Sequence, residues 1–162
     1  MVQRIAIIDQ KQVGDLFLLV EEIWREVFTK IIGAQQVERM LQEYQSPAAI
    51  WEEIQAGVQY FALVQEDGKW IGYTAYSVAK PEVLYISKLY LHESVRGQGL
   101  MREIFAWYDK LALEIGRRQQ LRVNRNNTNA IAVYEHQGFK IITQQTSEIA
   151  PGLVMEDYIF EK

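Results

Sequence analysis

Cysteine is absent from the chain of 162 residues, and histidine occurs only twice. Without thiols the chain can form neither a disulfide framework nor a thiolate metal site, and two lone histidines argue against structural zinc. Proline is also scarce, with three residues, and no stretch rich in proline, glycine or serine interrupts the sequence. We therefore expect a single domain over residues 1–162 that holds no metal ion.

Long hydrophobic runs are missing as well. The apolar run within MVQRIAIID, at the start of the chain, is too short for a signal peptide, and no segment approaches the length of a membrane span. Hydrophobic residues nevertheless make up 49% of the chain, which is ample for a buried core. These features predict a soluble, cytoplasmic protein without a membrane partner.

Positive charge is in deficit, because the formal net charge is −4 at pH 7. A nucleic-acid partner would require a basic face, so this balance argues against one. Residues 9–56 contain nine acids and four bases, whereas residues 94–140 contain eight bases and four acids. The basic segment suits a polyphosphate ligand and the acidic segment could attract a cationic substrate, although either could instead be a solvated helix face.

A stretch with two glycines, Val95–Met101 (VRGQGLM), joins two regular segments. The preceding segment, Val83–Leu91, is rich in β-branched and aromatic residues, which predicts a strand. The following apolar residues recur at helical spacing from Leu100 to Ile115, and Gly116 is placed to end that helix. The sequence therefore predicts a strand, a glycine loop and a helix in succession.

Gly97 and Gly99 give this loop its chemical character. Glycine has no Cβ, so the backbone can turn sharply there and a ligand can approach it closely. The first N–H groups of the following helix point outward at the positive end of its dipole, which favours an anion. The loop therefore predicts a pyrophosphate site, and an ordinary glycine-containing turn is the alternative.

A second segment, Asn127–Phe139 (NTNAIAVYEHQGF), has the pattern of a short capped helix. Asn127 or Thr128 can cap this helix, Tyr134 lies on it, and Gly138 ends it before a new apolar strand. The segment places an asparagine and a tyrosine on the element that follows the crossover from the glycine loop.

In this order and at this separation, the two segments resemble the GNAT superfamily of acyl-CoA-dependent N-acyltransferases. In that family an R-x-x-G-x-(Gly/Ala) loop holds the CoA pyrophosphate, and an N-x-x-A-(3)-Y-(3)-G-F segment carries the Asn and Tyr that meet the cofactor. Met101 departs from the pattern, because the family usually has Gly or Ala there, and its side chain would have to point into the sheet. The matching residues are Arg96, Gly97, Gln98, Gly99, Asn127, Ala130, Tyr134, Gly138 and Phe139.

The resemblance also implies a set of contacts with acetyl-CoA. The strands at 83–91 and 120–124 would splay apart, and the acyl-pantetheine arm would lie between them like an extra strand. Leu89, Tyr90 and Leu91 would then offer backbone hydrogen bonds to the arm. The other cofactor contacts implied are Arg96, Gly97, Gln98, Gly99, Leu100, Met101, Asn127, Ala130 and Tyr134.

The pattern of the whole chain predicts a mixed α/β (α+β) fold with a central sheet of about seven strands, flanked by about four or five helices. Asp67-Gly68 predicts an antiparallel hairpin, and the glycine loop, helix and strand predict a parallel crossover. A polar loop containing Pro151-Gly152 is expected between the last two strands. The expected strands cover residues 4–8, 58–65, 69–79, 83–91, 120–124, 139–143 and 154–160, and the expected helices begin near Asp9, Gly33, Ser46, Leu100 and Asn127.

An amine can attack a thioester directly, so the reaction implied by the resemblance needs few side chains. The leaving thiolate must be protonated, and its acid has a pKa of about 8.5. Tyr134, with an ordinary pKa of ~10, is a matched general acid. A buried structural tyrosine is the alternative interpretation of this residue.

The general base is less apparent, because Val83–Leu91 contains no carboxylate where many members of the family place a glutamate. Glu82 precedes this strand and His92 follows it, so both are candidate catalytic residues. Histidine titrates near neutrality, although a lone histidine at a strand end is usually a surface residue. Ser87 and Lys88 could instead orient waters that carry the proton away.

We therefore predict an acetyl-CoA-dependent N-acetyltransferase that acts on the primary amine of a small cationic, polyamine-like metabolite. The segment Met155–Lys162 (MEDYIFEK), taken with ISKLYL, is faintly similar to polyamine acetyltransferases. Two alternatives stay open, namely a non-catalytic acyl-CoA-binding sensor domain on the same fold and an acetyltransferase that modifies a protein amine. The sequence is also compatible with a homodimer.

Overall fold

The computed structural model describes residues 1–162, apart from the side chain of Ala150. Its strands are β1 (Gln3–Ala6), β2 (Gln59–Val64), β3 (Trp70–Ser77), β4 (Val83–Leu91), β5 (Arg118–Asn124), β6 (Lys140–Ala150) and β7 (Leu153–Glu161). Its helices are α1 (Gln10–Ile32), α2 (Ala34–Glu43), α3 (Pro47–Gln55), α4 (Leu100–Ile115) and α5 (Thr128–His136), with a short 3-10 helix η1 (Glu93–Val95).

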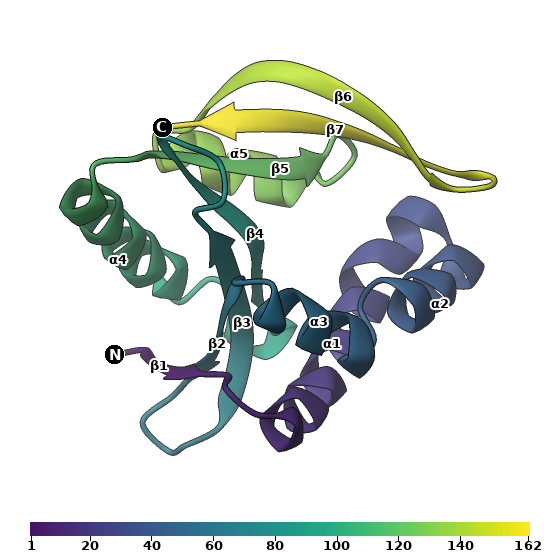
Figure 1. Cartoon of the computed structure of the whole chain (residues 1–162), viewed down its shortest axis with the longest axis horizontal. Helices are drawn as coiled ribbons and strands as arrows, with labels where there is room; N and C mark the ends of the chain where they lie inside the picture. Colours follow the sequence, from purple (N-terminus) through teal and green to yellow (C-terminus); the bar gives the residue numbers. More distant parts are fainter.

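The strands form one sheet in the order β1-β2-β3-β4-β5-β7-β6 (Figure 1). The β4–β5 pair is parallel, and the other neighbouring pairs are antiparallel. A mixed sheet of seven strands with flanking helices confirms the predicted fold class.

Helices cover both faces of this sheet, with α1, α2 and α3 on one side and α4 and α5 on the other (Figure 1). The first group packs on Tyr60, Tyr73 and Ala75, and we call this side the α1–α3 face. The second group packs on Leu84 and Ile86, and we call this side the α4–α5 face. Each face therefore has its own apolar core, because strand side chains alternate between the two sides of a sheet.

Helix α1 is tied to both its own start and the sheet. Asp9 accepts a hydrogen bond from the Gln12 backbone at 2.8 Å while the Gln12 side chain accepts one from Asp9, which forms a capping box. Trp24 donates its indole N–H to the Tyr73 hydroxyl at 2.9 Å, so α1 is also hydrogen-bonded to β3. The buried residues of α1 recur at helical spacing and are Val13, Leu16, Leu19, Val20, Ile23, Trp24 and Phe28.

Strands β4 and β5 pair only at their beginnings. The ladder joins Val83–Ile86 to Arg118–Leu121, and beyond these residues the two strands are not paired. An opening therefore lies between the second half of β4 and the end of β5. This is the splay that the family resemblance implied.

A β-bulge in β4 lies next to this opening. Ala75 of β3 pairs with Lys88, whereas Tyr76 pairs with Ile86, so Ser87 has no partner residue in the register. The extra residue resets the alternation of side chains along the strand. As a result Lys88 shares the α1–α3 face with Ala75, next to the point where β4 separates from β5.

The last two strands differ from the expectation. Instead of a polar loop after residue 143, β6 continues to Ala150 and pairs with β7 along its length, and only Pro151-Gly152 lies between them. The polar run in β6 is misleading because β6 is an edge strand whose residues from Lys140 to Thr146 are all exposed. A strand without a buried face needs no apolar alternation, so its sequence resembles a loop.

The β6–β7 hairpin reaches across the molecule towards α2 (Figure 1). Arg39 of α2 donates to the Pro151 carbonyl at 2.9 Å, and the Tyr44 hydroxyl donates to the Ile149 carbonyl at 2.9 Å. The tip of the hairpin is thereby fastened over one edge of the α1–α3 face.

Other boundaries move by a few residues. The first strand is Gln3–Ala6 rather than 4–8, because Ile8 leads into the Asp9 cap, and β5 begins at Arg118 rather than at 120. The strand at 83–91 and the helix at 100–115 have the predicted bounds. Within the described residues, no helix combines the length and the apolar character that crossing a membrane requires.

Candidate active site

A cavity of about 840 Å³ opens where β4 ends. Its walls are Leu89–Leu91 of β4, the residues of 95–102 other than Gln98, and parts of α5 with the preceding loop. Helix α1 closes the cavity with Glu26, Val27 and Lys30. The two segments that carry the family resemblance therefore face each other across one space.

Most of the predicted cofactor contacts line this cavity, whereas Gln98 and the candidate bases Glu82 and His92 do not. The predicted residues that line it are Leu89, Tyr90, Leu91, Arg96, Gly97, Gly99, Leu100, Met101, Asn127, Ala130 and Tyr134.

The glycine loop has a backbone conformation that is readily accessible only to glycine. Gly97 has φ 77° and Gly99 has φ 78°, both in the left-handed region. Gly99 is the N-cap of α4 and offers no side-chain cap, and the Gly99 carbonyl accepts from Arg102 at 3.2 Å, so the N–H groups that precede Arg102 in the helix have no capping oxygen. The positive end of the α4 dipole thus meets the cavity, which suits a pyrophosphate.

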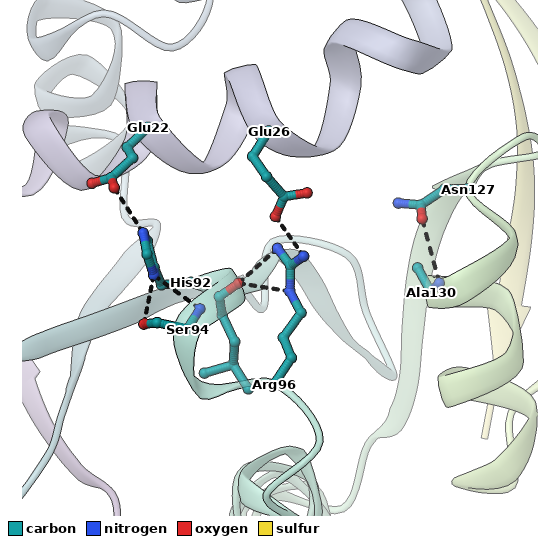
Figure 2. A network of polar contacts seen from close by, with 8 residues as sticks. Glu22, Glu26, His92, Ser94, Arg96, Asn127 and Ala130 are labelled. Carbon is teal, nitrogen blue, oxygen red and sulfur yellow. Dashed lines mark hydrogen bonds and ion pairs between the residues drawn. The ribbon is translucent and has the colours of Figure 1, made fainter.

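Arg96 is bound to the protein itself. Its Nε and Nη2 atoms donate to the Leu91 carbonyl at 3.1 and 2.9 Å, and its guanidinium forms an ion pair with Glu26 of α1 (Figure 2). Arg96 therefore braces the loop against the end of β4, and Glu26 offsets part of its charge. Lys30 and Arg102 also line the cavity and add positive charge to it.

His92 makes a second contact between the same loop and α1. Its Nδ1 accepts the Ser94 N–H at 3.1 Å, so its Nε2 carries the proton that it donates to Glu22 at 2.7 Å (Figure 2). Both ring nitrogens are thus engaged, and His92 caps η1. We call the pairs Glu22–His92 and Glu26–Arg96 the α1 clamp, because the two glutamates lie one helical turn apart.

Glu82 lies at the other end of β4. Leu89 follows it by seven positions, which corresponds to about 23 Å in an extended strand. Its carboxylate is exposed and lies 3.8 Å from Arg118. The structure therefore brings neither Glu82 nor His92 to the wall of the cavity.

Tyr134 projects from α5 into the aromatic core of the α4–α5 face. Its ring packs edge-on against Phe105 and Phe160, each with a centroid distance of 6.0 Å, and the residue also lines the cavity. Burial raises the pKa of Tyr134 above its ordinary value, so the hydroxyl keeps its proton at neutral pH. Asn127 starts this helix by accepting the Ala130 N–H at 3.3 Å (Figure 2).

Met101 packs against the core of the α4–α5 face while it lines the cavity. The side chain is half-buried, in the first turn of α4. Met101 therefore belongs to the apolar core and to the cavity wall at once.

Sequence reasoning named Lys88 but missed Arg122 and Asp157, which lie near it on the α1–α3 face beside the splay. Arg122 of β5 lies 3.3 Å from Asp157 of β7, and Lys88 of β4 is half-buried nearby. A signal was present, because Asp157 alternates in phase with the buried Leu153 and Met155. Among the described residues, no group of three or more His, Cys, Asp or Glu side chains is placed to hold a metal ion.

The model of the acetyltransferase (GNAT) family matches residues 19–139 of the chain. The chain therefore belongs to this family, and it is an acetyl-CoA-dependent N-acetyltransferase. A comparison with curated proteins gave no match.

Solved structures with the same fold include the PaiA N-acetyltransferase of Thermoplasma acidophilum, in complex with coenzyme A. It is 18% identical, with a TM-score of 0.80 over 100% of this chain and 98% of that one. A GCN5-related N-acetyltransferase of Rhodopseudomonas palustris is 14% identical, with a TM-score of 0.79 over 99% and 94%. A GNAT acetyltransferase of Streptococcus pneumoniae is 19% identical, with a TM-score of 0.68 over 100% and 99%.

Proposed function

We propose that the protein transfers the acetyl group of acetyl-CoA to the primary amine of a small cationic, polyamine-like metabolite, with Tyr134 as general acid. The observation that carries this proposal is the shared cavity, because the α4 N-terminus and Tyr134 line the same space. An anion-binding element and a protonated hydroxyl are the two features that cleavage of a CoA thioester requires.

The residues of the cavity fit acetyl-CoA. The first N–H groups of α4, with Gly97 and Gly99, would hold the pyrophosphate, and Leu89–Leu91 would offer backbone hydrogen bonds to the pantetheine arm at the unpaired half of β4. Acetyl-CoA would supply the activated acetyl group. The coenzyme A complex of the similar Thermoplasma acidophilum enzyme supports this arrangement.

Tyr134 would donate its proton to the thiolate as the C–S bond breaks. The raised pKa supports this role, since a hydroxyl that stays protonated is a donor at every physiological pH. The Tyr134 ring is fixed by Phe105 and Phe160, which supports a defined direction for the O–H group. Positioning of this kind is the main requirement of general acid catalysis.

The cationic nature of the acceptor is proposed from charge. The segment of residues 9–56, which forms α1–α3, contains nine acids and four bases and covers one face of the sheet beside the splay. Several of these acids are neutralised by ion pairs, including Glu21, Glu38 and Glu43. Glu53 makes a hydrogen bond instead, because it accepts from the Tyr60 hydroxyl at 2.8 Å. A small metabolite of this kind also fits a cytoplasmic location, where acetyl-CoA is formed and consumed.

The test is thiol release from acetyl-CoA with matched amines. We expect putrescine and spermidine to be acetylated faster than neutral or acidic amines of similar size, with an apparent affinity that falls as salt rises. Equal rates for anionic and cationic acceptors would refute the charge preference. Acetyl-CoA binding without thiol release for any amine or protein acceptor would favour the alternative of an acyl-CoA sensor.

A further inference from the structure

Asp157 is a buried carboxylate beside the splay. Its exposed fraction is 6%, and it is the only Asp, Glu, Lys, Arg or His among the buried residues that the structure describes. An ionised carboxylate is expensive to bury unless it is paired, and such groups are found preferentially at functional sites. The stability of the fold therefore does not explain why Asp157 is buried in β7, and a functional role does.

The register of the sheet places Asp157 near the reaction centre. Asp157 pairs with Asn124, the last residue of β5, and on the α1–α3 face it follows Met155. The chain then turns at Asn127 into α5, which carries Tyr134. Asp157 thus stands at the end of β5, and Tyr134 packs on Phe160, three residues further along β7 in the core of the opposite face.

Tyr90 links the two groups. Burial raises the pKa of Tyr90, and its neighbours Tyr73, Tyr134, Tyr85 and Asp157 raise it further. Tyr90 also lines the cavity, at the unpaired end of β4. Asp157 and Tyr134 therefore both act electrostatically on one wall residue, and no strand fills the space between β4 and β5 there.

Arg122 orients the carboxylate. Its Nε atom lies 3.3 Å from Oδ2 of Asp157, while its Nη1 donates to Gln145 at 3.4 Å. Burial raises the pKa of Asp157, and Arg122 opposes that rise. One oxygen is held by Arg122, and Oδ1 is the atom left to meet an ammonium group.

The other groups that face Asp157 are tyrosines. Tyr85 and Tyr90 approach it from β4, and β6 contributes only the neutral Gln145. Lys88 and Glu53 interact with each other next along this face, and Lys88 also lies near Arg122. Asp157 does not itself line the cavity, and the side chains that connect it to the splay are Tyr85 and Tyr90 of β4.

We infer that Asp157 binds the ammonium group of the acceptor and accepts its proton, which is a role that rests on the proposed function. In the overall reaction the nitrogen loses two protons, one C–N bond forms and one C–S bond breaks. Asp157 takes the first proton and passes it to water. Tyr134 protonates the sulfur, and the second proton from nitrogen restores its hydroxyl, so that one proton leaves with the thiol and one enters the solvent.

The test compares Asp157→Asn with Glu156→Gln by single-turnover kinetics with spermidine between pH 5 and 9. Glu156 is the adjacent carboxylate, which pairs with Arg125 on the other side of the strand. We expect Asp157→Asn to lose about 10²–10⁴-fold in rate together with the acidic limb of the profile, at unchanged acetyl-CoA affinity. Glu156→Gln should keep the wild-type rate and the acidic limb of the pH profile.

A second variant guards against misfolding of the first. Arg122→Gln removes the cation that opposes protonation of Asp157, so the acidic limb should move to higher pH. A folded Asp157→Asn that keeps the wild-type rate and limb, or an Arg122→Gln profile that does not move, would overturn the role of Asp157 alone. A wild-type protein that releases no thiol with any amine would overturn the proposed function together with it.

Discussion

Two regions meet at the end of β4 and present different chemical groups. The glycine loop with the start of α4 presents backbone N–H groups, and its conformation depends on the left-handed φ angles of Gly97 and Gly99. The α1–α3 face beside the splay presents side chains instead, with Lys88, Arg122 and Asp157 coming from three different strands. The first region should therefore be sensitive to backbone changes and the second to changes of charge.

The largest effect on the reaction rate is expected from removing the hydroxyl group of Tyr134. Tyr134→Phe keeps the ring contacts with Phe105 and Phe160, so the fold and the acetyl-CoA affinity should survive. The single-turnover rate should fall by about 10²–10⁴-fold, because only the general acid is lost. Steady-state rates would hide this loss if product release were limiting, so single turnovers are the appropriate measurement. An unchanged rate would make Tyr134 a structural residue.

A backbone change tests the first region. Gly99→Val places a β-branched residue at φ 78°, which should distort the loop and weaken acetyl-CoA binding by about tenfold or more in calorimetry. Gly68→Val is the matched control, because Gly68 has φ 83° in a hairpin turn that does not line the cavity. Both variants should lose stability, and only the first should lose affinity. Equal affinities would show that the loop does not hold the pyrophosphate.

The α1 clamp allows a charge test in the same region. Arg96→Ala removes a brace as well as a charge, so acetyl-CoA binding should weaken, and part of the loss should shrink as salt rises. Glu26→Gln removes the acid that offsets this charge, so binding of the anionic ligand should tighten by about twofold to fivefold at low salt.

If Arg96→Ala weakens acetyl-CoA binding and Glu26→Gln tightens it, the effect comes from charge and not from disruption of the loop. If Glu26→Gln weakens binding as much as Arg96→Ala does, the pair acts by holding the loop in place. A salt-independent loss in Arg96→Ala would support the same conclusion.

The smallest effect concerns the stability of the second region. Burial lowers the pKa of Lys88, so the folded protein binds this proton less tightly than the unfolded chain, whose lysine pKa is about 10.4. Stability should therefore rise with pH between these two values. Lys88→Met should raise the unfolding free energy at pH 7 by on the order of 1 kcal/mol and flatten this slope. Lys110→Met, at an exposed position of α4, should leave both unchanged in urea titrations.

The same contrast explains what the sequence could predict. The glycine loop, α4 and the Asn127 cap are local, so residues close together in sequence determine them, and Val83–Leu91 and Leu100–Ile115 appear with the predicted bounds. A loop that presents backbone N–H groups can therefore be predicted from one continuous stretch of sequence.

The α1–α3 face beside the splay lacks such a pattern. Asp157 and Arg122 meet only because β7 is inserted between β5 and β6, and that strand order is not visible in spacing. The Glu22–His92 contact spans seventy residues, which is why His92 resembled a free base in the sequence. The edge strand β6 resembled a loop because all of its residues from Lys140 to Thr146 are exposed, so no apolar alternation marks it as a strand.

The α1 clamp makes the glycine loop and the splay depend on one helix. The same continuous helix holds the loop through Glu22 and Glu26, and its other side packs on the sheet through Trp24–Tyr73 and Phe28–Tyr90. A substitution that displaces α1 would therefore disturb the loop and the wall at Tyr90 together, although the two lie in separate parts of the sequence.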